Sequence, residues 1–113
     1  MKLLVLVLNK TECLEGILTQ LGSQGLTGAT ILDSQGLAQS LYNHKGLSFM
    51  ASLRMFMGPD NHENKTVFMV LDDDKVPVVS KIINDVTGGL DRHNTGIMFT
   101  LNVDSVEGFT RKE

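Results

Sequence analysis

The chain has 113 residues, which fits a single domain, and its hydrophobic content of 42% is sufficient for a packed core. Charged residues make up 20% and the net charge is −3, a balance typical neither of a disordered chain nor of a general nucleic-acid binder, which usually carries a basic surplus. No apolar run approaches the length of a membrane span, and the lone Cys13 fits a reducing compartment. We expect one domain over residues 1–113 in a cytoplasmic protein that binds no nucleic acid and does not insert into membranes.

The first part of the chain predicts a strand, a helix and a second strand. Residues 3–8 form a short uninterrupted apolar run, which is typical of a buried strand. The i, i+3, i+4, i+7 spacing of one helix face is then occupied by Leu14, Ile17, Leu18 and Leu21. Gly22 is expected to end this helix. Residues 25–33, rich in Thr, Ile and Leu, predict the second strand.

The second part repeats this pattern after an insertion. Residues 34–46 are predicted as a long loop and residues 47–57 as a short amphipathic helix. The unbroken apolar run at residues 67–71 predicts a third strand over residues 65–71, and residues 97–103 predict the fourth. Between these strands, the spacing of a second helix face is marked by Val76, Val79, Ile83 and Val86.

This order of elements predicts an α+β fold, a ferredoxin-like βαββαβ plait with a long loop and a short helix inserted between strands 2 and 3. In such a plait the helices cover one face of the sheet. The apolar runs at residues 3–8 and 67–71 do not alternate with polar residues, as strands with one solvated face do. We therefore predict an oligomer in which neighbouring subunits cover the second face. The alternative is that the helix at residues 47–57 covers it.

Five stretches carry a resemblance to a known family: MKLLVLVLNK (1–10), GLTGATILDSQGLAQ (25–39), SLRMF (52–56), NKTVFMVLDDD (64–74) and TGIMFTLNVDSVEGF (95–109). They resemble the PII-like signal-transduction proteins, a divergent branch related to the nitrogen regulatory PII family. The resemblance covers nearly the whole chain. It implies a compact homotrimer with the sheets at its centre and an adenine nucleotide bound in clefts between subunits. It also implies that a loop after the second strand, the T-loop, meets partner proteins.

The resemblance also implies where a ligand would bind. Thr27 is similar to the PII threonine beside the adenine, and Gly36 is similar to a glycine at the base of the T-loop. The stretch TGGLDRHNTG at residues 87–96, here called the glycine loop, resembles the B-loop that wraps the phosphates. Its implied ligand-binding residues are Thr87, Gly88, Gly89, Arg92, His93, Thr95 and Gly96.

The chain departs from standard PII proteins in the length of the B-loop, in the spacing of the T-loop and at two sites of charged residues. Ile97 stands where a lysine follows the B-loop glycine, and residues 106–110 hold none of the arginines found near the PII C-terminus. A smaller, different or less charged ligand than ATP is therefore an alternative. No obligatory cofactor is predicted, and an adenine nucleotide is the candidate ligand.

Considered without the resemblance, the glycine loop has two interpretations. Glycines let backbone amides approach an anion, and Arg92 and His93 add donors. However, the loop follows the C-terminal end of a predicted helix, where the helix dipole favours cations. Gly88 or Gly89 would serve equally well to end that helix. Both interpretations stay open.

The sequence contains no enzyme signature and no metal motif. No serine lies in a nucleophile elbow, and the histidines at 44, 62 and 93 are scattered rather than paired as zinc ligands are. We expect a non-catalytic trimeric PII-like regulatory protein that senses an adenine nucleotide or a related small ligand. Its signal would pass through residues 34–63 to a protein partner whose identity the sequence does not give. The alternatives are a metal-responsive trimer like the CutA-type proteins and a purely structural trimeric module.

Overall fold

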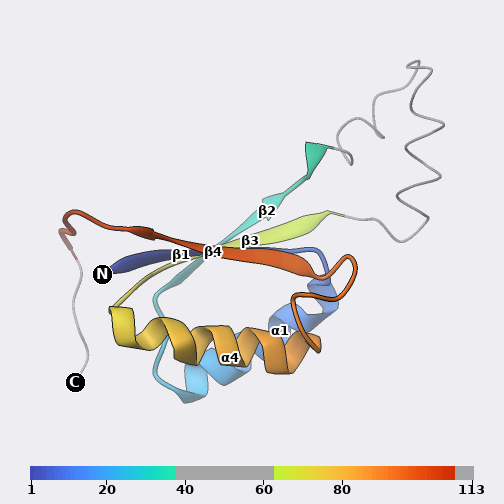
Figure 1. Ribbon diagram of the computed structural model, residues 1–113, viewed down its shortest axis with the longest axis horizontal. Coiled ribbons are helices and arrows are strands. Elements are labelled where there is room, and N and C mark those ends of the chain that lie inside the picture. The colour runs from blue at the N-terminus through green and yellow to red at the C-terminus, as the bar shows by residue number, and fades with distance from the viewer. Residues whose placement is uncertain (38–62, 109–113) are drawn as a thin grey trace.

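The computed structural model describes residues 1–37 and 63–108. Within them, four strands form one antiparallel sheet and two α-helices lie side by side on one of its faces (Figure 1). The strands are β1 (Lys2–Leu8), β2 (Ala29–Ser34), β3 (Asn64–Leu71) and β4 (Gly96–Asn102), and the helices are α1 (Leu14–Ser23) and α4 (Val76–Thr87). The strand order is β2-β3-β1-β4. The predicted α+β class is thus confirmed, with the four strands and two long helices near their predicted positions.

The end of α1 differs from the prediction, because the helix continues past Gly22 and ends at Ser23. The chain turns instead at Gly25, which has a φ of 74°. The amide of Leu26 donates to the carbonyl of Leu21 (2.9 Å) and the amide of Gly25 donates to that of Gly22 (3.0 Å). This is the hydrogen-bond pair of a Schellman motif, in which the left-handed glycine lies beyond the last helical residue. The turn occupies the residues expected to begin the second strand, so β2 starts only at Ala29.

The core lies between the sheet and the helices. Alternate residues of β1 and β3 face the helices, as their register requires, and a single cluster of buried apolar side chains results. Its members are Leu4, Leu6, Leu8, Ile17, Leu21, Val67, Met69, Leu71, Val79 and Ile83. Every one of the α1 and α4 members was placed on a helix face by the sequence spacing. This face of the sheet is hereafter the covered face.

The two helices approach each other closely at their contact near Val86. A Cβ atom on Gly16 would lie 3.0 Å from Val86 Cγ1, so a side chain there would force the helices apart. One turn earlier, the half-buried thiol of Cys13 lies 3.8 Å from the carbonyl oxygen of Val86. The absence of a side chain at Gly16 is therefore what lets α1 pack directly on α4.

The opposite face of the sheet, hereafter the open face, is covered by none of the described helices (Figure 1). Strand register and alternation place on it Leu3, Val5 and Val7 of β1, Thr30, Leu32 and Ser34 of β2, Asn64, Thr66, Phe68 and Val70 of β3, and Ile97, Phe99 and Leu101 of β4. None of these side chains is charged. Ile97, Phe99 and Leu101 are 45–59% exposed. The open face is thus apolar at its centre and along β4.

Part of the predicted insertion lies outside the described residues. Of residues 34–63, the structure shows that Ser34 ends β2 and that Asn64 begins β3 immediately after them. The short helix predicted at residues 47–57, and the histidines at 44 and 62, fall in the part that is not described. Among the residues that are described, no helix is long and apolar enough to cross a membrane.

Candidate functional site

The glycine loop joins α4 to β4, and its first amides are engaged within the chain. Gly88 takes the left-handed position after the last helical residue, with a φ of 88°, and its amide donates to the carbonyl of Asn84 at 3.0 Å. The amide of Gly89 donates to Thr87 Oγ1 at 3.2 Å, and the amide of Leu90 donates to Asn84 Oδ1 at 2.8 Å. These successive amides are therefore committed to ending the helix rather than left open for an anion.

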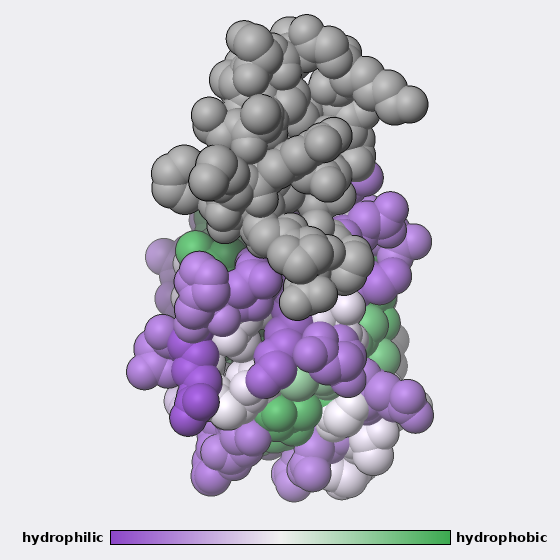
Figure 2. All heavy atoms as spheres, turned by 90° about the vertical axis from the view of Figure 1, so that its right-hand side faces the viewer, coloured by the Kyte–Doolittle hydropathy of each residue, from purple (hydrophilic) through white to green (hydrophobic). Residues whose placement is uncertain are grey.

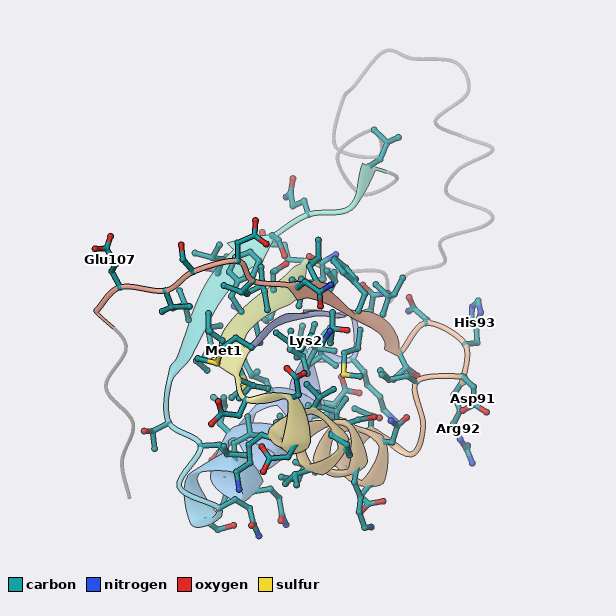
Figure 3. All side chains as sticks on the ribbon, turned by 60° about the vertical axis from the view of Figure 1, so that its left-hand side comes forward. Met1, Lys2, Asp91, Arg92, His93 and Glu107 are labelled. Atoms are coloured by element: carbon teal, nitrogen blue, oxygen red, sulfur yellow. The ribbon has the colours of Figure 1, made fainter. Side chains whose placement is uncertain are left out.

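The charged side chains of the loop lie at its tip. Asp91, Arg92 and His93 project from the loop away from the sheet and helices, and Arg92 and His93 point in different directions (Figure 3). Arg92 Nε donates to the carbonyl oxygen of Gly88 at 3.0 Å, which leaves its terminal N–H groups facing outward. The surface at this end of the molecule is largely hydrophilic, with smaller hydrophobic patches (Figure 2). Within one chain, the side chains of Arg92 and His93 therefore do not converge on a common ligand position.

A second cation, Lys10, lies at the end of α4 and was missed by the sequence reasoning. Its Nζ donates to the carbonyl oxygen of Thr87 at 3.2 Å, in a partly buried contact. A lysine at this position interacts favourably with the C-terminal end of the helix dipole. The available signal was its place directly after β1, because β1 pairs with β4 and so its end must meet the glycine loop.

Three of the predicted ligand-binding residues have structural roles. Thr87 is buried, and its hydroxyl donates to the carbonyl of Ile83 at 2.7 Å. Thr95 is also buried, and its carbonyl oxygen accepts the amides of Asn9 (2.9 Å) and Lys10 (3.1 Å). At Gly96 a Cβ atom would lie 2.5 Å from the carbonyl oxygen of Val7. Thr87 thus fixes the start of the glycine loop to α4, and Thr95 and Gly96 fix its end to β1 and the residues directly after it.

The remaining two predicted residues lie at opposite ends of the sheet. Gly36 follows β2 at the end where the glycine loop lies, and a Cβ atom on it would be 3.9 Å from Asn64 Nδ2. Thr27 precedes Ala29, which pairs with Met69 towards the other end. In Figure 1 the connection from α1 to β2 and the glycine loop lie at opposite ends of the molecule. A single chain therefore does not bring Thr27 to the loop.

A hydrogen-bonded group of four polar side chains, the corner cluster, lies at the end of the sheet that carries the glycine loop. It forms where β1 ends, β2 ends and β3 begins. Its members are Asn9, Ser34, Asn64 and Thr66. Ser34 Oγ donates to Asn64 Oδ1 and lies 2.7 Å from Thr66 Oγ1. Asn64 Nδ2 donates to Asn9 Oδ1 at 3.4 Å. Sequence reasoning missed this cluster, because it comes from three segments far apart in the chain.

Two ion pairs carry the resolved pKa shifts, and neither includes a residue of the glycine loop. The N-terminal ammonium of Met1, 2.9 Å from Asp73, donates a hydrogen bond that lowers the pKa of that carboxyl. The hydrogen bond from Lys65 to Asp33 raises the pKa of the lysine. The described part of the chain holds no group of three or more side chains that would bind a metal ion.

No protein-family model matches this chain, and no curated protein matches it significantly. The resemblance to PII-like proteins therefore rests on the five stretches of sequence alone.

Proposed function

We propose that this protein is a non-catalytic regulatory protein of the PII-like type, folded as a ferredoxin-like plait and assembled as a homotrimer. It would sense an adenine nucleotide or a related small ligand between subunits and signal through residues 34–63. The strand order β2-β3-β1-β4, with every neighbouring pair antiparallel, supports the plait, because two β-α-β halves interleave in this way.

The open face is the observation that carries the proposal. A contiguous apolar surface of this kind on a small domain marks an interaction site. Its uncharged side chains favour a second copy of the chain as the partner, because two identical faces can then meet without like-charge repulsion. The exposed Ile97, Phe99 and Leu101 would supply most of the apolar area removed from water.

An oligomer would also complete the ligand site. Thr27 and the glycine loop lie at opposite ends of the folded subunit. A cleft that contains both would therefore take Thr27 from one subunit and the loop from another. Arg92 and Lys10 each donate one hydrogen bond to a carbonyl oxygen at the end of α4, and each has further N–H donors. Those donors suit the phosphate or carboxylate of an anionic ligand. Gly36, near the start of residues 34–63, would link the cleft to the rest of that segment.

The first experiment measures the mass of the purified full chain in solution and its melting temperature with ATP, ADP, AMP, cyclic nucleotides and divalent metals. A ligand present at about 100 times its Kd should raise the melting temperature by roughly 5–15 °C. The shift should be lost in Arg92→Ala. Lys81→Ala is the matched control, because Lys81 is an exposed cation on α4 paired with Asp85 at 2.7 Å, away from the glycine loop.

The other outcomes separate the alternatives. A trimer whose stability responds only to metal would favour the metal-responsive class. A trimer whose stability responds to none of these compounds would favour a structural module. A monomer at concentrations of tens of micromolar would contradict the proposal, because the open face would then have no second copy on it.

A further inference from the structure

The corner cluster can be assigned one consistent direction of hydrogen bonding. Ser34 has a single hydroxyl proton, and its Oγ lies closer to Asn64 Oδ1 than to the carbonyl oxygen of Asn64 at 3.4 Å, so the proton is assigned to the bond with Asn64 Oδ1. The bond between Ser34 and Thr66 must then use the proton of Thr66. The carboxamide of Asn64 accepts from Ser34 through its oxygen and donates to Asn9 through its nitrogen. The result is a continuous chain from Thr66 through Ser34 and Asn64 to Asn9, in which neighbouring bonds polarise one another.

The backbone of Asn9 extends this chain to the glycine loop. Its amide donates to the carbonyl oxygen of Thr95, the residue directly before β4. Both Thr95 and Asn64 are over nine-tenths buried, so water does not readily replace either partner. Asn9 is thus the only member of the corner cluster that bonds to the glycine loop and to Asn64 at once, among the residues that the structure describes.

We propose that Asn9 is a positioning residue that couples the glycine loop to the adjoining ends of β2 and β3, at Ser34 and Asn64. A change in the loop that shifts Thr95 pulls on Asn9 and loosens its contact with Asn64. At 3.4 Å, this contact is the longest link among the side chains and is therefore the first to open. Because residues 34–63 leave the sheet at these strand ends, the coupling would give the proposed regulator its path from ligand to output. That consequence rests on the proposed function, but the coupling itself does not.

The test is a double-mutant cycle read by native-state hydrogen exchange on the full chain without ligand. The loop is perturbed by Asn94→Val, since Asn94 has a φ of 57° that a β-branched residue adopts only with strain. Asn94→Gly is its matched control, because glycine takes that φ freely. The link is cut by Asn9→Ala, and Asn9→Asp restores it by keeping an acceptor oxygen opposite Asn64. Exchange at residues 32–34 and 64–67 is compared with exchange at Val70 and Leu71, at the far end of β3.

We expect Asn94→Val to raise exchange at the near strand ends about threefold or more relative to the far end of β3, and Asn94→Gly to leave it unchanged. In the Asn9→Ala background the same loop change should have almost no such effect, and Asn9→Asp should recover it. An equal increase with and without the Asn9 side chain would overturn the proposal, as would no increase in either background. Since no ligand is present, these results stand whether or not the nucleotide and assembly experiments support the proposed function.

Discussion

The covered face and the open face of the same sheet are both apolar, yet they differ in what lies against them. In β1 the covered-face residues Leu4, Leu6 and Leu8 are almost completely buried under the helices. On the open face, Val5 at the centre of β1 is 6% exposed, but the β4 residues that flank β1 keep about half of their surface exposed. A strand that is apolar without alternation predicts burial on both faces of the sheet. Here α1 and α4 cover only one of those faces.

The largest effect should come from emptying the covered face. Leu6→Ala is expected to lower the free energy of unfolding by about 2–5 kcal/mol, because it leaves a cavity in a close-packed core. Leu32→Ala removes the same atoms from an open-face residue that is 48% exposed, and should cost about 1 kcal/mol or less in the isolated chain. Denaturant unfolding of both variants measures the difference. Equal losses would show that the two faces are equally buried in solution.

A charge on the open face should act on assembly instead. Phe99→Glu is expected to weaken subunit association by about 100-fold or more, because the proposed interface would have to bury unpaired carboxylates. It should leave the fold of the single chain intact, since Phe99 is 45% exposed in it. Light scattering across a dilution series reads the effect. The matched control is Thr100→Glu, at the neighbouring position on the other face of β4. Assembly unaffected by Phe99→Glu would show that the subunits meet elsewhere.

The exposed apolar residues of the open face belong to β4, and Gly96 allows the start of β4 to lie close to β1. A side chain at Gly96 would meet the carbonyl oxygen of Val7, and its φ of 154° disfavours other residues. Gly96→Ala should therefore destabilise the chain by about 1–3 kcal/mol. Gly108→Ala is the comparison, since nothing lies within 4 Å of a Cβ atom there and only its φ of 78° resists the change. A larger loss at Gly108 would contradict the steric argument.

The smallest effect concerns the exposed ion pair at the rim of the sheet. The N-terminal ammonium holds the pKa of Asp73 below its ordinary value of 3.8. The stabilisation is therefore present above that ordinary value and is lost as the pH falls through the lower pKa of the folded state. Asp73→Asn should make the unfolding midpoint less dependent on pH below about 4. An unchanged acid dependence in the variant would show that the pair contributes nothing measurable, as many exposed pairs do.

Most of the fold could be predicted, because burial dictates the spacing of apolar residues. Both helix faces were correct, and the four strands differ from expectation mainly at their ends. The exceptions are local. Gly22 looked like a helix stop, but the hydrogen-bonded turn that ends α1 forms around Gly25. A single glycine inside a helix costs about 1 kcal/mol, which packing of Leu21 and its neighbours readily offsets.

Less of the candidate site could be predicted, because it depends on contacts between distant segments. The sequence located the glycine loop and left open whether it binds an anion or ends a helix. In the chain itself, its first amides do the second. The contact of Lys10 with the end of α4 joins residues far apart in the chain, as does the link from Asn9 to Asn64. Neither contact produces a recognisable motif in the neighbouring sequence. The place of Thr27, far from the loop, follows from strand register and not from the motif that resembles PII.

The packing of α1 on α4 gives the protein a chemical reporter of its own. Cys13 is the sole cysteine of the chain, and its thiol lies half-buried against the carbonyl of Val86 where the two helices meet. A maleimide would therefore label one position. Its rate would rise with the frequency at which α1 and α4 separate near Cys13. The time course of alkylation would compare the wild type with every variant above in native buffer, with no engineered probe.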